Sequence, residues 1–173
     1  LDINKLGLAT ATEFLDMITG QYIADLITWG AIGARTTESQ IHREMASALS
    51  CPVGVKSATN GNIKIAIDAI RAAHASHYFY SPDKNGRMTV YRTSGNPYGH
   101  VILRGGDKGP NFDAESVDIA CKQLAEFDLP QRLVVDFSHA NCQKQHRKQL
   151  DVAQDICEQI KSNKNQIAGI MAE

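Results

Sequence analysis

The alternation of short apolar runs with amphipathic stretches is the feature that most constrains how this chain can fold. Six runs have the length of a strand, and the segments between them carry apolar residues at helical spacing. This alternation is typical of repeated strand and helix units around a parallel sheet, so the predicted fold class is α/β. The expected strands are residues 8–15, 31–36, 52–57, 100–105, 133–138 and 166–172.

Five amphipathic helices are predicted between these strands, and their apolar stripes are interpreted as core. Thr37 and Gln40 have the spacing of a capping box, which predicts a helix start directly after the second strand. Asp113 suits the N-cap of a later helix. The apolar stripes begin at Tyr22, Ile41, Ile63, Val117 and Leu150.

The regular pattern is interrupted in the middle of the chain, where the stretches HYFYSP and RMTVYRT flank DKNG. We expect an inserted β-hairpin over about residues 76–93, with Asn85 and Gly86 in its turn. No low-complexity linker divides the chain. Residues 1–173 are therefore predicted to form a single domain.

The composition is that of an ordinary soluble protein, 43% hydrophobic with a net charge of −1. Balanced charge provides no overall field for nucleic acid or an anionic membrane, so neither partner is expected. The chain has no signal peptide, no long apolar run and no C-x-x-C pair, which predicts a cytoplasmic location and free thiols. Cys121 and Cys157 fall on helix stripes and are expected to be buried, and both chain ends are interpreted as cut.

Polar or charged residues occur at or just beyond the end of every predicted strand. In a closed parallel barrel the carboxyl ends of the strands converge on one face, where catalytic groups are drawn from several strands. Any single one of these residues could instead be polar only because strands end at the surface. The residues are Glu13, Arg35, Lys56, Arg104, Asp136 followed by His139, and Glu173.

Three of these side chains are cations, Arg35, Lys56 and Arg104. Grouped at one end of a barrel, these cations would repel one another by several kcal/mol unless an anion lay among them. Guanidinium groups bind carboxylate or phosphate oxygens in pairs, whereas lysine supplies a movable charge that can transfer a proton. The set predicts a multiply charged ligand such as a phosphorylated carboxylic acid.

His139 and Glu173 form a second candidate pair. Imidazole and carboxylate together suit a borderline divalent cation, Mn, Fe, Co or Zn. The alternative is that His139 is only hydrogen-bonded within its loop. The remaining histidines are interpreted as structural or surface groups.

The stretches GAIGARTTESQ, CPVGVK, HVILRGG, VVDFSHAN and IAGIMAE, in this order, closely resemble the class I (type Iα) 3-deoxy-D-arabino-heptulosonate 7-phosphate (DAHP) synthases. The resemblance covers essentially the whole chain, and GARTTESQ with DFSHAN is highly specific. It implies a (β/α)8 TIM barrel, here a partial barrel that corresponds to strands three to eight. It also implies a homo-oligomer, either a dimer or a tetramer.

This family of transferases condenses phosphoenolpyruvate with erythrose 4-phosphate to DAHP and phosphate, the first step of the shikimate pathway to aromatic amino acids. The resemblance implies that Arg35, Lys56 and Arg104 bind phosphoenolpyruvate, with the Ala34 backbone at its phosphate. Lys56 and Glu13 would also hold the water that attacks C2. His139 and Glu173 would be two ligands of the divalent metal.

Some parts of the family pattern would lie outside this chain. A cysteine ligand and a Lys-Pro-Arg-Thr stretch would precede Leu1, and a final aspartate ligand would follow Glu173, so these residues alone are expected to be inactive. Inside the chain, SATNGN replaces the usual NGTDG after Lys56.

The family's feedback site for an aromatic amino acid is also represented, although Gly20 replaces a usual proline. Ser81 favours phenylalanine as the effector. The matching positions are Gln21, Leu49, Ser50, Phe79 and Ser81.

Two other functions remain open at this point. 3-Deoxy-D-manno-octulosonate 8-phosphate synthase shares the barrel and phosphoenolpyruvate, but GARTTESQ and the hairpin argue against it. A non-catalytic anion-binding remnant is the third reading. The residues upstream of Leu1 would distinguish these functions.

Overall fold

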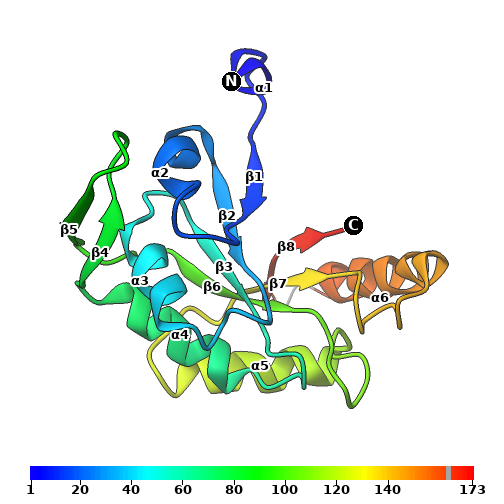
Figure 1. The fold of residues 1–173 in the computed structure, drawn as a ribbon. Coiled ribbons are helices and arrows are strands. Elements are labelled where there is room, and N and C mark those ends of the chain that lie inside the picture. The colour runs from blue at the N-terminus through cyan, green and yellow to red at the C-terminus, as the bar shows by residue number, and fades with distance from the viewer. Residues whose placement is uncertain (163–164) are drawn as a thin grey trace. The chain divides into compact units, whose positions relative to one another are not determined.

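The computed structural model describes residues 1–162 and 165–173 and divides them into two compact units (Figure 1). The first unit contains residues 1–55 and 68–99, and the second contains residues 56–67 and 100–173. The chain therefore crosses between the units inside strand β3 (Val53–Lys56), inside helix α4 (Lys64–His74) and at the start of strand β6 (Gly99–Leu103). Helices and strands alternate within both units.

The first unit contains a parallel sheet of β1, β2 and β3. Glu13 of β1 lies opposite Ala31 of β2, and Gly30 of β2 lies opposite Val53 of β3. Helix α3 contacts strand β4 of the hairpin. The elements are α1 (Asp2–Lys5), β1 (Ala11–Glu13), α2 (Gly20–Ile23), the 3-10 helix η1 (Ala24–Leu26), β2 (Trp29–Ile32), α3 (Gln40–Ala48), β3 (Val53–Lys56), α4 (Lys64–His74), β4 (Tyr78–Pro82) and β5 (Met88–Arg92).

The second unit contains a parallel sheet of β6, β7 and β8. Ile102 pairs with Val134, and Asp136 pairs with Met171. All four residues of β7 are buried, as expected for a parallel strand covered on both faces. The elements are β6 (Gly99–Leu103), α5 (Ala114–Ala125), β7 (Leu133–Asp136), the 3-10 helix η2 (His146–Lys148), α6 (Gln149–Lys161) and β8 (Ile167–Met171).

Each of the six predicted runs overlaps an observed parallel strand, which confirms the predicted α/β class. Strands β2 and β6 begin before the predicted runs, at Trp29 and Gly99. The strands end earlier than predicted, at Glu13, Ile32, Lys56, Leu103, Asp136 and Met171, because the residues after them already belong to loops. The hairpin of β4 and β5 pairs Phe79 with Tyr91, and Gly86 in its turn has a left-handed φ of 75°. Only the backbone freedom of glycine makes that conformation inexpensive.

Two local predictions are wrong. Helix α3 begins at Gln40 with Ser39 as its N-cap, and not with a capping box at Thr37. The hydroxyl of Thr37 instead donates to the carbonyl of Gly33 and closes the turn after β2. Cys157 is exposed, because helix α6 buries Val152 and Ile156 on a different face. The structure leaves all four cysteines as free thiols.

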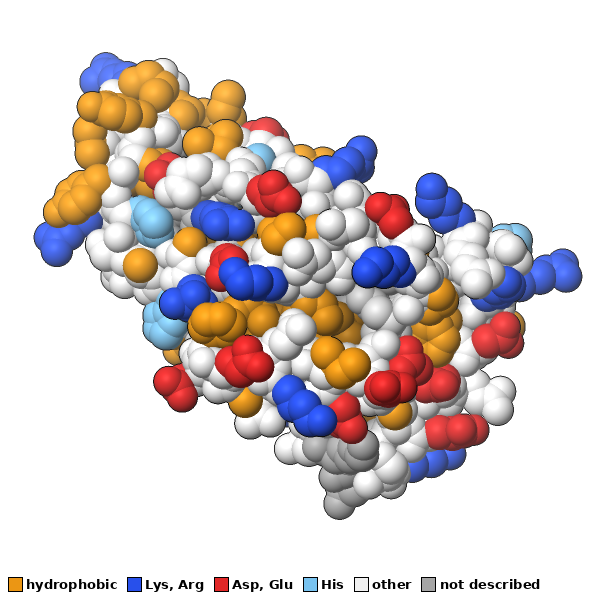
Figure 2. Space-filling model, turned by 90° about the horizontal axis from the view of Figure 1, so that it is seen from below, with side chains coloured by type: hydrophobic (Ala, Val, Ile, Leu, Met, Phe, Trp, Pro, Cys, Tyr) orange, Lys and Arg blue, Asp and Glu red, His pale blue; other side chains and the backbone are white. Residues whose placement is uncertain are grey.

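The surface carries charges of both signs. Figure 2 shows basic and acidic side chains interspersed over the face seen from below, in keeping with the net charge of −1. Among the described residues, no helix has both the length and the apolar character needed to cross a membrane.

Asp113 caps helix α5, as predicted, by accepting from the backbone N–H of Ser116 at 2.9 Å and from its hydroxyl at 2.7 Å. Partial burial opposes ionisation, but the hydrogen bonds from Ser116 outweigh it and hold the pKa of Asp113 below its usual value. The folded state therefore binds this proton less readily than the unfolded chain. The resulting stabilisation is present above the unfolded pKa of about 3.9 and is lost as the pH falls through the lower folded pKa.

Asp113→Ala is expected to lower the free energy of unfolding by about 1 kcal/mol at neutral pH, because the N-cap acceptor is lost. Urea denaturation at neutral pH and at low pH measures the effect, which should shrink in acid. Asp113→Asn is the matched control, since asparagine caps comparably without a titrating group. Equal midpoints for Asp113→Ala and the unaltered protein at neutral pH would contradict the assignment.

Candidate functional site

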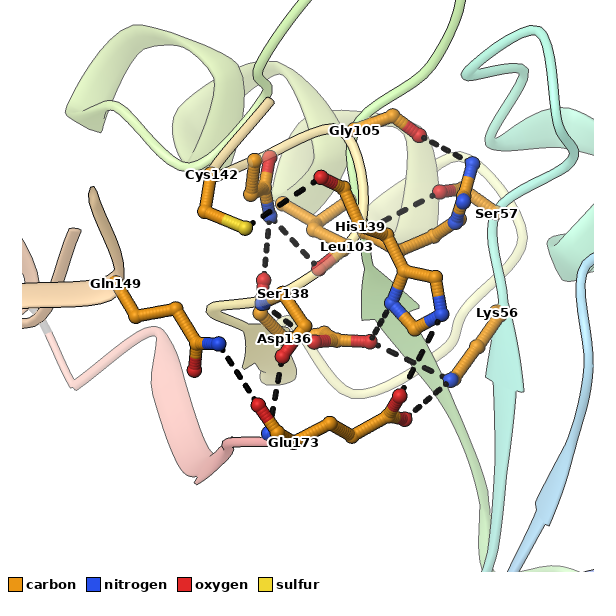
Figure 3. A network of polar contacts seen from close by, with 12 residues as sticks. Lys56, Ser57, Leu103, Gly105, Asp136, Ser138, His139, Cys142, Gln149 and Glu173 are labelled. Atoms are coloured by element: carbon orange, nitrogen blue, oxygen red, sulfur yellow. Dashed lines mark hydrogen bonds and ion pairs between the residues drawn. The ribbon is translucent and has the colours of Figure 1, made fainter. Parts of the chain in front are cut away.

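The second unit gathers polar side chains at the carboxyl ends of its strands (Figure 3). Lys56 is the last residue of β3, Asp136 is the last residue of β7, and Arg104 follows β6 directly. His139 and Glu173 lie in the segments after β7 and β8. Because β6, β7 and β8 run parallel, their carboxyl ends share one edge, and this edge is where parallel barrels place their reactive groups.

Asp136 is the centre of this cluster and is completely buried. Its Oδ2 lies 2.9 Å from Nδ1 of His139 and 3.4 Å from Nζ of Lys56, and its Oδ1 accepts from the backbone N–H of Ser138 at 2.8 Å. A buried carboxylate is tolerated only with such compensation. Both oxygens of Asp136 are therefore engaged by protein donors.

His139 is oriented by Asp136 so that its other ring nitrogen faces Glu173. With Nδ1 donating to the carboxylate, a neutral imidazole offers the lone pair of Nε2. That Nε2 lies 3.6 Å from Oε2 of Glu173. One potential ligand atom from each of Asp136, His139 and Glu173 falls within 4.8 Å of the others. This nitrogen and oxygen donor set fits a borderline divalent metal held between His139 and Glu173, with Asp136 as the supporting group.

The backbone at His139 is held in a left-handed conformation, with φ of 56°. Such a conformation is unfavourable for a residue with a side chain and persists only where the surroundings impose it. The N–H of Lys144 donates to the carbonyl of His139 at 2.8 Å and closes this loop. The loop therefore holds the imidazole in place.

Lys56 lies buried between the two carboxylates of the cluster. Its residue exposure is 2%, and its Nζ lies 3.1 Å from Oε1 of Glu173 as well as 3.4 Å from Oδ2 of Asp136. Two acidic partners within ion-pair distance compensate the buried ammonium. Lys56 thus contacts one of the two possible metal ligands, Glu173, and the carboxylate of Asp136 that orients the other, His139.

Arg104 presents hydrogen-bond donors to a cavity. Its Nε is buried and has no hydrogen-bond partner among the described residues, and its Nη1 makes only a long contact of 3.4 Å with the carbonyl of Gly105. A buried donor without an acceptor carries a cost of about 1–3 kcal/mol. With Lys144, Arg104 lines a cavity of about 400 Å³. A guanidinium that lines a cavity is suited to bind an anionic oxygen there.

Two asparagines that sequence reasoning missed join the loops of the site. Asn141 donates to the carbonyls of Leu103 at 3.2 Å and Asp136 at 2.7 Å, and its Oδ1 accepts from the N–H of Asn111. Asn111 in turn accepts from the N–H of Gly105 at 2.7 Å. The loop beside Arg104 is therefore tied to the end of β7. The only sequence signal was the position of Asn141 inside DFSHAN.

The remaining predicted substrate residues lie together in the first unit. Glu13 ends β1, and Ala34 and Arg35 lie in the turn after β2. A Cβ on Gly33 would stand 2.1 Å from Oε1 of Glu13, so only glycine allows this carboxylate to lie against the turn. That Glu13, Ala34 and Arg35 form one substrate site with Lys56 and Arg104 stays a prediction.

Four of the five predicted effector residues line one cavity of about 140 Å³ in the first unit. The Nε2 of Gln21 lies 3.4 Å from Oγ of Ser81, and Phe79 stacks on Tyr91 with ring centroids 5.8 Å apart. Leu49 closes the same cavity, whereas Ser50 lines a neighbouring cavity of about 500 Å³. The first cavity is mainly apolar with a small polar side, which suits an aromatic ligand.

Comparisons with known proteins agree with this geometry. The profile of the DAHP synthetase I family matches residues 2–173. The chain is 72% identical over all 173 residues to proteins of Shigella flexneri and Escherichia coli K12, each named Trp-sensitive phospho-2-dehydro-3-deoxyheptonate aldolase. It covers 49% of each of them, and so spans about half the length of these relatives.

A solved structure from Francisella tularensis SCHU S4, of phospho-2-dehydro-3-deoxyheptonate aldolase, is similar to this chain with a TM-score of 0.96. The two are 54% identical, and the match covers 98% of this chain and 50% of that one. This similarity confirms the predicted partial TIM barrel fold. The names of the relatives do not support the expected preference for phenylalanine.

Proposed function

Because the chain belongs to the DAHP synthetase I family, we propose that the longer protein containing it condenses phosphoenolpyruvate with erythrose 4-phosphate to DAHP and phosphate. The observation that carries the proposal is the cluster at the strand ends in which buried Lys56 and Asp136 contact the more exposed His139 and Glu173. It combines a possible metal position with a cation beside it. Arg104, which lines a cavity of the same unit, adds a cation that can bind an anionic group there.

Phosphoenolpyruvate would be bound by its two anionic groups. Arg104 and Arg35 offer guanidinium donors for phosphate or carboxylate oxygens, and the backbone N–H of Ala34 would lie at the phosphate. Lys56 supplies a third positive charge from a buried position. These contacts would orient C3 of the substrate toward the aldehyde, which removes much of the entropic barrier to a reaction of two molecules.

The divalent metal, Mn, Fe, Co or Zn, would be held by His139 and Glu173 with further ligands from the longer protein. When bound, it would supply a Lewis acid that polarises the aldehyde oxygen of erythrose 4-phosphate. Asp136 would keep His139 in the tautomer that presents Nε2. Glu173, with a side chain that is 47% exposed, is the more exposed residue of this pair.

The bond changes assign separate tasks to the remaining residues. A C–C bond would form between C3 of phosphoenolpyruvate and the aldehyde carbon, the aldehyde oxygen would take up a proton, and positive charge would be left at C2. Water held by Lys56 and Glu13 would add to C2 and give up one proton, which balances the proton taken by the aldehyde oxygen. The new C2 hydroxyl would then become the C2 carbonyl as the bond from C2 to the phosphate oxygen breaks, and its proton would leave with the phosphate. Lys56 is suited to this task because an ammonium can orient the water and transfer a proton.

The direct test is phosphate release from phosphoenolpyruvate by the full-length protein. We expect release to require both erythrose 4-phosphate and a divalent metal, and to stop after complete metal removal with a chelator. Release that ignores erythrose 4-phosphate, or that survives metal removal, would defeat the proposal. The 173-residue chain assayed alone is expected to be inactive.

Arg104→Ala is expected to weaken phosphoenolpyruvate binding by at least about 2 kcal/mol, since a buried charge partner of the anion is lost. This corresponds to about a 30-fold rise in Kd, measured by calorimetry on the metal-free full-length protein. Arg132→Ala, at an exposed arginine of the same unit, is the control and should leave Kd unchanged. An unaltered affinity in Arg104→Ala would remove Arg104 from the binding site.

An aromatic amino acid is the proposed effector, bound in the cavity between Gln21, Leu49, Phe79 and Ser81. The relatives named Trp-sensitive favour tryptophan over the phenylalanine expected from Ser81. Inhibition of the full-length protein by each amino acid decides between them. A protein unaffected by tryptophan, phenylalanine and tyrosine would exclude this regulation. The predicted dimer or tetramer stays a prediction.

A further inference from the structure

The main chain of Glu173, the last residue described, is held at its nitrogen and at its oxygen (Figure 3). The backbone N–H donates to Oγ of Ser138 at 2.9 Å, and the main-chain oxygen accepts from Nε2 of Gln149 at 2.7 Å. Neither bond involves the carboxylate, which is left to face His139 and Lys56. Two side chains from another segment thus fix the backbone that carries the carboxylate.

Both holding residues belong to the segment that carries His139. Ser138 is its neighbour, and the N–H of Ser138 donates to the Asp136 carboxylate that orients the imidazole. Gln149 is the first residue of α6, the helix that follows the same loop. The orientation of His139 and the position of Glu173 are therefore coupled through one stretch of chain.

We propose that Gln149 and Ser138 are positioning residues for the metal site, which keep the Glu173 carboxylate opposite Nε2 of His139. The inference rests on the proposed function in taking His139 and Glu173 as metal ligands. A glutamate has several rotatable bonds, and a backbone free to move would add to the entropy lost when a metal orders it. Fixing the peptide in advance reduces that loss, as supporting hydrogen bonds around metal ligands do.

Gln149 gives the cleaner test because it is half-buried at a helix start, whereas Ser138 is buried in the cluster. Mn²⁺ alone is titrated into the metal-free full-length protein by calorimetry. We expect Gln149→Ala to raise the Kd for Mn²⁺ by about 10-fold or more, the range found for supporting residues of metal ligands. Gln145→Ala, an exposed amide of the same loop, is the matched control and should leave Kd unchanged.

Gln149→Glu separates positioning from packing, because it keeps the shape but places a carboxylate against the Glu173 carbonyl. It should raise the Kd for Mn²⁺ at least as much as Gln149→Ala does. A merely structural role would lower the thermal unfolding temperature of the metal-free protein without changing Kd, and that result would overturn the inference. The visible spectrum of bound Co²⁺ should change in both Gln149 variants but not in Gln145→Ala, since the spectrum follows ligand geometry.

The outcomes also separate this inference from the proposed function. Equal Mn²⁺ affinity in wild type, Gln149→Ala and Gln149→Glu would overturn the positioning role and leave the proposed function standing. A wild-type protein that binds no divalent metal would overturn the proposed function and the inference together. Ser138→Ala should reproduce the affinity loss, and in combination with Gln149→Ala the two losses should not simply add, because both act on one peptide segment.

Discussion

Lys56→Met is expected to abolish phosphate release and to lower the free energy of unfolding by about 3 kcal/mol, the range for a buried pair broken on one side. Methionine has a similar length, so the change removes the charge while keeping most of the packing. The Asp136 carboxylate, completely buried, would then lose a cation 3.4 Å away. Activity would fall for a second reason, because the proposed water at C2 loses its ammonium partner.

Phosphate release and urea denaturation of the full-length protein measure the two effects separately. Lys122→Met, at an exposed lysine of helix α5, is the control. It should leave phosphate release unchanged and should change the free energy of unfolding by no more than about 0.5 kcal/mol. Activity within tenfold of the unaltered protein would exclude Lys56 from the reaction. An unchanged denaturation midpoint would show that Asp136 does not depend on Lys56.

His139→Ala is expected to raise the Kd for Mn²⁺ by more than about 100-fold, because a direct ligand should matter more than the 10–100-fold of its supporting groups. The nitrogen that is lost, Nε2, is the one that faces Glu173 at 3.6 Å. Phosphate release should fall to the level of the chelator-treated protein. Added metal should restore it only in part, since the remaining donors cannot complete the site.

Calorimetry with Mn²⁺ and the phosphate assay test this expectation on the same protein. The matched control is His146→Ala, because His146 is exposed and lies on the same segment in η2. It should leave both quantities unchanged. Mn²⁺ affinity retained in His139→Ala would place the metal elsewhere and would leave His139 as a loop residue hydrogen-bonded to Asp136.

The predicted strands and the helix cap at Asp113 agree with the structure because they depend on local patterns. Apolar periodicity follows from the geometry of a strand or helix, and an N-cap needs only residues one turn away. The capping box at Thr37 had the correct spacing but is absent. Its hydroxyl donates to the carbonyl of Gly33, a contact created by the turn after β2.

The predicted burial of Cys157 was wrong for a related reason. Its stripe was apolar, but which face of α6 is buried depends on how the helix packs, and the structure buries Val152 and Ile156. A helix with apolar residues on more than one face does not determine its own orientation. Periodicity alone therefore predicted the helix and not its buried side.

The sequence by itself determined which residue types stand at the strand ends, and motif resemblance carried His139, Glu173, Lys56 and Arg104 to proposed roles. Only the tertiary structure decided which residues support them. Asp136 contacts both Lys56 and His139, and Asn141 connects two loops. Ser138 and Gln149 hydrogen-bond to the backbone of Glu173. The physical reason is that periodicity and capping depend on neighbours along the chain. A hydrogen bond such as that from Gln149 to Glu173, 24 residues apart, forms only when the packing of β7, β8 and α6 brings its two atoms together.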